Sequence, residues 1–273
     1  MLQRIWLCTD PESGTARRCD AVDRETRQQA LRTNRGTYWM CGETGQLERQ
    51  REAIDLAQHY DEEWSEKSSP DQDHKRAASY KRWLAHLEPY RRTGRLFEVG
   101  TGQGLFLRTA VGAGWEASGT ELSPFAAQRA REVSGATVFT DPAETVPLED
   151  GTLDVVLLNN VLEHLAQPRT ALIRLSRALR PGGAMFLQTL NAQSLCLARN
   201  PMDWKYFHEG HLFIPTLISL DAYFAAASLR SVRRSTHGYH SVPRRKLRDK
   251  LTANVAGRLG LGHRVKCVVE RPG

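Results

Sequence analysis

One stretch, residues 96 to 105, constrains the fold of this 273-residue chain more than any other: Leu-Phe-Glu-Val-Gly-Thr-Gly-Gln-Gly-Leu. A short apolar run ends at Val99, and glycines follow at positions 100, 102 and 104. Glycine adopts positive φ at little cost and lets a ligand approach the backbone closely. The pattern is typical of a buried strand that turns sharply into a helix. The free N–H groups at the start of that helix favour a nucleotide-like ligand.

Apolar runs alternate with helical stretches after this turn. The pattern predicts strands at 96–99, 116–121, 136–140, 154–159, 184–189, 229–236 and 264–270. It predicts helices at 71–90, 105–113, 124–134, 168–179, 215–227 and 243–259, and a turn at 181–183. We therefore expect a Rossmann-like, doubly wound α/β sheet of seven strands, mostly parallel with an antiparallel last strand. Such sheets bind ligands beyond the carboxyl ends of their strands.

The first 70 residues are weakly patterned. We expect short strands and loops over 8–45 and a helix near 46–60, with Tyr60 and Trp64 in part of a lid. The predicted organisation is an N-terminal extension over 1–70 and a second domain over 71–273. Cap insertions are expected in that domain at about 192–215 and 238–262.

The glycine spacing discriminates between two kinds of ligand. A dinucleotide fold has the pattern G-x-G-x-x-G, and Leu105 stands where that pattern requires its last glycine. Glu98 lies two residues before the first glycine. A carboxylate there suits a positively charged amino group and is unfavourable beside a pyrophosphate. The stretch therefore favours a nucleoside that carries an amino acid over NAD.

Five blocks in order resemble the class I S-adenosylmethionine-dependent methyltransferases, especially the subgroup of ubiquinone-pathway O-methyltransferases. The blocks are Glu98–Gly104, Gly119–Ser123, Leu153–Val156 with Val161–Leu165 and Pro168, Leu179–Gly183, and Thr189–Asn191. The resemblance covers residues 96–191. It implies S-adenosylmethionine as the cofactor and methyl transfer as the reaction.

The resemblance also assigns cofactor contacts. Glu98 would hold the methionine amino group, and the three glycines, Gly100, Gly102 and Gly104, would let the backbone pack against the cofactor. Glu121 would accept hydrogen bonds from the ribose hydroxyls, with Leu122 against the adenine. Asp141 is matched to the adenine amino group, although Pro142 after it has no N–H to donate. Asn159 and Asn160 would border the methionine. The other reading of Glu98 and Glu121 is a pair of surface carboxylates.

The segment from Tyr38 to Gly45 resembles the second knuckle of a zinc ribbon that precedes some related methyltransferases. Thr44 stands where those proteins have a cysteine, and the partner of Cys8 is also missing. Since a structural zinc site needs four ligands, we expect a degenerate ribbon and predict no metal. The five cysteines form no C-x-x-C pair and do not indicate a disulfide framework.

Three histidines are the candidates for the general base that a hydroxyl acceptor would require: His164, His208 and His211. Each could instead have a purely structural or surface role. The sequence favours O-methylation of a small molecule in secondary metabolism or glycan biosynthesis, and leaves N- and C-methylation open. The aromatic residues of 202–215 suggest a ring, sugar or lipid-like acceptor, or they simply pack the cap.

The net charge is +7, with arginine and lysine concentrated at 233–234 and 244–250. The basic balance supports an alternative, a tRNA or rRNA methyltransferase, but no N/D-P-P-Y/F motif follows the fourth strand, so we expect no nucleic-acid partner. A protein that binds S-adenosylmethionine without catalysis is a third reading.

The helix over 243–259 is a candidate for weak contact with a membrane surface. No apolar run is long enough to cross a membrane, and the cytoplasm is the expected location. The oligomeric state is left open.

Overall fold

A computed structural model describes residues 27–33, 36–41, 44–49, 70–201, 204–239 and 246–273. The chain divides into two compact units. Unit 1 comprises residues 1–52, 160–170 and 187–268, and unit 2 comprises residues 53–159, 171–186 and 269–273. Within the described ranges, no helix has the length and apolar character needed to span a membrane. The predicted division at residue 70 stays a prediction.

The predicted seven-stranded sheet is confirmed, with strand order β10-β11-β8-β7-β4-β5-β6. Its strands are β4 (Arg95–Val99), β5 (Glu116–Thr120), β6 (Thr137–Phe139), β7 (Leu153–Asn159), β8 (Leu179–Leu190), β10 (Arg230–His237) and β11 (Arg264–Glu270). Strands β7, β4, β5 and β6 pair in parallel, and the sheet has an antiparallel end. The chain order reverses between β4 and β7, which is the switch point where such sheets bind ligands.

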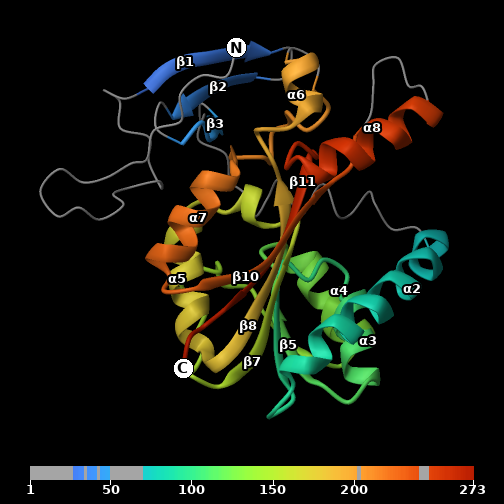
Figure 1. The fold of residues 1–273 in the computed structure, drawn as a ribbon. Coiled ribbons are helices and arrows are strands. Elements are labelled where there is room, and N and C mark those ends of the chain that lie inside the picture. Colours follow the sequence, from blue (N-terminus) through green and yellow to red (C-terminus); the bar gives the residue numbers. More distant parts are fainter. Residues whose placement is uncertain (1–26, 34–35, 42–43, 50–69, 202–203, 240–245) are drawn as a thin grey trace, which may run out of the picture. The chain divides into compact units, whose positions relative to one another are not determined.

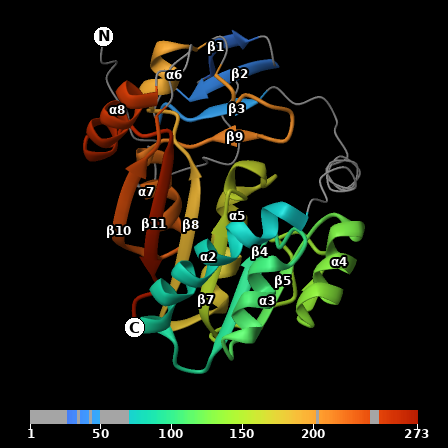
Figure 2. The same cartoon turned by 90° about the vertical axis from the view of Figure 1, so that its right-hand side faces the viewer.

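Helices cover both faces of the unit 2 strands. Figures 1 and 2 show α2 (Pro70–Leu87), α3 (Leu105–Gly112) and α4 (Pro124–Ser134) on one face and α5 (Pro168–Ala178) on the other. A 3₁₀ turn, η1 (Glu88–Tyr90), joins α2 to β4. The core between α2, α3, α4 and the strands contains Leu87, Leu96, Phe106, Leu107 and Val155, each at most 2% exposed. This core fixes the end of β4 and the start of α3 relative to each other.

The turn predicted at 181–183 is wrong, because β8 continues through it. Gly182 donates its N–H to the carbonyl of Arg271 at 2.9 Å, and Arg271 donates to the carbonyl of Gly183 at 3.0 Å. Backbone pairing with a distant segment thus keeps a Pro-Gly-Gly sequence in the strand. Gly182 takes a positive φ of 72°, which accommodates the local irregularity.

Unit 1 contains a second sheet, and its first two strands lie within residues 8–45, where short strands and loops were expected. Its strand order is β1 (Arg27–Thr33), β2 (Gly36–Cys41), β3 (Leu47–Arg49) and β9 (Phe213–Ile214), and all its pairings are antiparallel (Figure 2). The helix predicted near 46–60 is wrong at Leu47–Arg49, because these residues form β3. The remainder of that predicted helix, with Tyr60 and Trp64, lies outside the described residues.

The other elements of unit 1 are the 3₁₀ turn η2 (Leu162–His164) and helices α6 (Leu195–Arg199), α7 (Leu217–Ala226) and α8 (Lys246–Arg258). Helix α7 begins after Thr216, whose hydroxyl accepts from the Ser219 N–H in a capping box. A second core cluster surrounds three aromatic side chains at most 1% exposed: Tyr38, Trp204 and Phe207. This cluster packs the residues of the predicted insertion against β2.

Candidate functional site

The glycine turn has the backbone geometry that its sequence predicts. Gly100, Gly102 and Gly104 have φ values of 69°, 51° and 76°, all in the region that side chains disfavour. A Cβ on Gly104 would also lie 2.6 Å from the Cα of Ala130, so glycine allows α3 to approach α4. Gly104 precedes the first turn of α3 and makes no side-chain cap, which leaves the first helical N–H groups oriented towards the turn.

Glu121 holds this turn in place from the neighbouring strand. Its Oε2 accepts the N–H of Gly102 at 2.8 Å, and its Oε1 accepts the N–H of Ser123 at 3.2 Å. The side chain is only 7% exposed. A carboxylate oxygen has two lone pairs, so each oxygen keeps the capacity to accept a hydroxyl. Sequence reasoning placed Glu121 at the ligand but missed its contact with the turn.

Glu98 lies near the end of β4 and is buried with an unsatisfied atom. Its Oε2 has no hydrogen-bond partner among the described residues. Burial raises the pKa of Glu98 well above its usual value, and the negative charge of Glu121 raises it further. A buried carboxyl beside a second carboxylate requires a positive charge to ionise. The cationic amino group of an S-adenosylmethionine molecule fits this requirement, as hydroxyl donors fit Glu121.

The remaining predicted cofactor residues lie around the same strand ends or follow them. Leu122 is half-buried directly after Glu121, whereas Asp141 is exposed and its carbonyl accepts the Thr120 hydroxyl. Asn159 ends β7, and Asn160 follows with an unusual positive φ of 54°. The Asn160 N–H donates to the carbonyl of Gln188 at 2.8 Å. Cofactor contact by these four residues stays a prediction.

The three predicted histidines come together in unit 1. The rings of His208 and His211 stack with centroids 4.3 Å apart, and those of His164 and His211 meet edge to face at 4.6 Å. His164 Nδ1 contacts the carbonyl of Gly210 at 2.8 Å, and His211 Nδ1 contacts the carbonyl of Tyr206 at 2.6 Å. Because a carbonyl only accepts, both Nδ1 atoms carry the proton. In the neutral rings the lone pair is therefore on Nε2.

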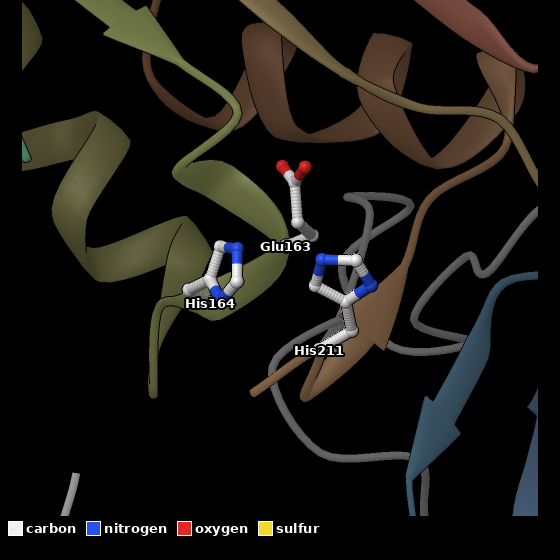
Figure 3. Close-up of side chains that lie close together, drawn as sticks. All are labelled: Glu163, His164 and His211. Carbon is white, nitrogen blue, oxygen red and sulfur yellow. The ribbon is translucent and has the colours of Figure 1, made fainter. Parts of the chain in front are cut away.

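Glu163 completes this group, and sequence reasoning did not include it as a site residue. Its side chain is 1% exposed, and its Oε2 accepts the Thr189 hydroxyl at 2.7 Å. Burial raises the pKa of Glu163 to about 7, against the opposing effects of the Thr189 hydroxyl, its own N–H and the positive Arg264. Glu163, His164 and His211 each offer one ligand atom, and these atoms all lie within 4.8 Å of one another (Figure 3).

The predicted degenerate zinc ribbon can be followed only in part. Cys41 is buried at the end of β2. The turn after it is closed by hydrogen bonds from Gly45 N–H to the Cys41 carbonyl and from Cys41 N–H to the Gln46 carbonyl, each 2.8 Å. Thr44 is 2% exposed, and its carbonyl accepts the hydroxyl of Thr216 at 2.7 Å. Cys8 lies outside the described residues, so the ribbon stays a prediction.

Residues 72–233 match the family described as Methyltransferase domain. This match covers more than half of the chain, and the protein belongs to that family. The family and the Rossmann-like fold together imply S-adenosylmethionine as the cofactor, which confirms the class that the five sequence blocks predicted.

Curated relatives share part of the sequence. Ubiquinone biosynthesis O-methyltransferases from Sodalis glossinidius and Roseobacter denitrificans are 27% and 32% identical over 171 and 152 residues, 56% and 50% of this chain. A third from Cereibacter sphaeroides is 33% identical over 135 residues, 47% of this chain. The chain spans 54–60% of the length of these relatives.

Solved structures show the same fold at lower identity. A chain in the complex of the Haloferax volcanii Trm112 methyltransferase activator with a methyltransferase has a TM-score of 0.58 at 16% identity. The match covers 82% of this chain and 100% of that one. An Archaeoglobus fulgidus methyltransferase has a TM-score of 0.56 at 16% identity, covering 79% of this chain and 100% of that one. These likenesses establish the fold alone.

Proposed function

We propose that this protein transfers the methyl group of S-adenosylmethionine to a hydroxyl group of a small-molecule acceptor. The observation that carries the proposal is the buried Glu98 Oε2, which has no hydrogen-bond partner among the described residues and lies beside Glu121 at the carboxyl ends of β4 and β5. A carboxyl in this position is unfavourable unless a cationic ligand completes it. Such a ligand, with hydroxyls for Glu121, matches the two polar ends of the cofactor that the family implies.

In this proposal the chain's residues bind and orient the cofactor. Glu98 accepts from the cationic amino group, and Glu121 accepts from the ribose while it holds the turn. Leu122 packs on the adenine, with Asp141, Asn159 and Asn160 at the rim. Bound S-adenosylmethionine supplies an electrophilic methyl group on a sulfonium. The three glycines keep the backbone open for that approach.

The histidine group is proposed to activate the acceptor. His164 and His211 present Nε2 with a lone pair, because backbone carbonyls hold the proton on Nδ1. His208 differs, since its Nδ1 accepts the Gly210 N–H at 3.1 Å, which leaves the proton on Nε2 in the neutral ring. His164 or His211 therefore takes the acceptor proton as the O–C bond forms and the C–S bond breaks. His208 serves as a positioning residue that stacks on His211.

The names of the curated relatives support oxygen as the acceptor atom and a small molecule as the substrate. Those proteins are named for O-methylation in ubiquinone biosynthesis, and the identity of 27–33% covers about half of this chain. We carry over the reaction type and the small-molecule class, and not the particular substrate.

Surface contact of α8 with an anionic membrane remains part of the proposal. Leu251 and Val255 lie one helical turn apart and are 64% and 58% exposed, and Leu259 just beyond the helix is 66% exposed. Lys250 and Arg258 are also exposed on this segment. An apolar strip flanked by cations suits the surface of a bilayer. In a flotation experiment the protein should be found with vesicles of anionic lipid, and the Leu251→Glu variant should stay in the vesicle-free fraction.

A radiolabelled methyl-transfer assay tests the function. Purified protein is supplied with S-adenosylmethionine and, separately, phenolic small molecules, amines and transcribed tRNA. We expect transfer to a hydroxyl compound that Glu121→Ala abolishes, with no transfer to RNA. Binding of S-adenosylhomocysteine without transfer to any class would instead favour the non-catalytic reading. Transfer to RNA that falls steeply with salt would favour the RNA methyltransferase, since phosphate contacts dominate such affinity.

A further inference from the structure

We infer that Glu163, His164 and His211 form a binding site for one divalent transition-metal ion of the zinc type. The carboxylate and the two ring nitrogens lie within 4.8 Å of one another. Figure 3 shows one ring nitrogen of each histidine facing the space between the rings, with the Glu163 carboxylate alongside. Two imidazoles and one carboxylate form a ligand set that zinc uses when it keeps a further position open.

The orientation of both rings is fixed by the kind of contact that supports metal ligands. Each Nδ1–H donates to a backbone carbonyl, Gly210 for His164 and Tyr206 for His211. A histidine held in this way presents Nε2 in the correct tautomer for coordination. The hydroxyl of Thr189 fixes the Glu163 carboxylate in the same manner. All three ligands thus have a second residue that orients them.

The two segments that carry the ligands are also tied together through the backbone. Leu212 donates its N–H to the carbonyl of Glu163 at 2.9 Å, next to the contact between His164 and Gly210. Gly210 permits this approach, because a Cβ there would lie 3.3 Å from His164 Nδ1. The hydroxyl of Tyr38 accepts the His208 N–H at 3.1 Å and pins the same loop. The ligands are therefore held close together before any ion binds.

Burial explains why a cation suits this place. Glu163 is 1% exposed and His211 is 7% exposed, so the carboxylate is far from bulk water. A buried negative charge is stabilised by a paired or coordinated cation. Tetrahedral zinc holds its ligands about 3.4 Å apart, so the side chains would close by about an ångström around the ion. This proposed site differs from the sequence-based prediction that the chain binds no metal. That prediction was based on the cysteines and did not include Glu163.

This site deepens the proposed activation of the acceptor and shares its Nε2 atoms. Without a bound ion, an imidazole would accept the proton of the acceptor hydroxyl directly. With the ion bound, the acceptor oxygen would bind to it, and the ion would lower the pKa of that hydroxyl. The binding of metal can be measured without acceptor or cofactor. Failure of metal binding is therefore distinguishable from failure of methyl transfer.

The test uses the full chain, stripped with a chelator and titrated with Zn²⁺ and then with Co²⁺. We expect one ion per chain, a visible Co²⁺ absorption typical of low coordination number, and a metal-dependent rise in Tm. Glu163→Gln should lower the affinity at least 100-fold. His164→Asn and His211→Asn should do so as well, since asparagine keeps a donor for the carbonyl and removes Nε2.

Two further variants make the result specific. Thr189→Val should weaken metal affinity by about tenfold, as loss of an outer-shell contact typically does. His86→Asn is the matched control, because exposed His86 has the same kind of Nδ1 contact, with the carbonyl of Arg82 on α2, and should leave affinity unchanged. Absence of binding by the folded wild type would overturn the inference. Equal binding by wild type and Glu163→Gln would overturn it too, since the ion would then lie elsewhere.

Discussion

Two buried carboxyl groups at opposite ends of neighbouring strands have contrasting surroundings. Asp154, at the start of β7, has no exposed surface, and every part of its carboxylate is satisfied. Its Oδ2 accepts the N–H groups of Arg92, Thr93 and Gly94 at 2.7–2.8 Å, and its Oδ1 accepts Arg180 Nε at 2.5 Å. Glu98, near the end of β4, has an Oε2 without a partner in the described part of the chain.

The pKa values of the two groups shift in opposite directions. Burial alone would raise the pKa of Asp154, but the hydrogen bonds from Arg180 and the three N–H groups lower it overall. Burial and Glu121 both raise the pKa of Glu98. A buried carboxylate whose hydrogen bonds are all made suits a structural role, whereas a buried one with an unsatisfied oxygen and a raised pKa is a candidate for contact with a ligand. We therefore expect Asp154 to stabilise the fold and Glu98 to contact the cofactor.

The largest effect is expected from Asp154→Ala. Removal of the carboxylate leaves three N–H groups and Arg180 without their acceptor, and should lower the free energy of unfolding by about 3–5 kcal/mol. Denaturant titration measures it. The stabilisation by Asp154 should be present above its unfolded pKa of about 3.9 and be lost as pH falls through the lower folded pKa. Asp150→Ala, an exposed partner of Arg174, should change stability by less than about 1 kcal/mol.

Glu121→Ala should act on cofactor binding more than on stability. The variant loses the acceptor for the Gly102 N–H and for the ribose, so we expect affinity for S-adenosylhomocysteine to fall about 30- to 100-fold. Isothermal titration provides the measurement. Glu116→Ala on the same strand is the control, because Glu116 forms an exposed pair with Arg95. Similar losses in both variants would remove the distinction between the two carboxylates.

Glu98→Gln should have a smaller effect, and it should raise the stability of the protein while it lowers the affinity for the cofactor product. The amide is neutral at every pH and avoids the cost that burial and Glu121 impose on ionising Glu98, so the ligand-free protein should gain up to about 1 kcal/mol of stability near neutral pH. Affinity for S-adenosylhomocysteine should fall about tenfold through loss of the charged acceptor. A variant that lost stability and kept its affinity would place Glu98 with Asp154 as a structural group.

Local signals in the sequence were sufficient for much of the large sheet. Helix α4 has its predicted bounds because Ser123 caps its start, Pro124 suits the first turn, and Gly135 ends it with a φ of 69°. The glycine turn and Glu121 were also predictable, since strand ends in a parallel sheet meet at one edge. That Glu98 Oε2 has no hydrogen-bond partner among the described residues could be learned only from the structure.

Long-range pairing accounts for what the sequence did not predict. Leu47 pairs with Ile214, more than 160 residues away, which makes a strand of a segment with helical periodicity. Arg271 pairs with Gly182 and Gly183 across about 90 residues and keeps a predicted turn in β8. The hydrogen bond between Glu163 and Thr189 also joins residues that are far apart in the sequence. No local pattern indicated that Glu163 would join the histidines.

Proton release on cofactor binding tests the central claim, that a cationic ligand completes Glu98. Because burial and Glu121 raise the pKa of Glu98, a cationic ligand beside it should lower that pKa, so binding of S-adenosylhomocysteine should release protons from this carboxyl group. Titrations near pH 6 in two buffers with different ionisation enthalpies count that proton. We predict release of up to one proton per ligand by the wild type, and none by Glu98→Gln. Equal proton release by the two proteins would contradict the account.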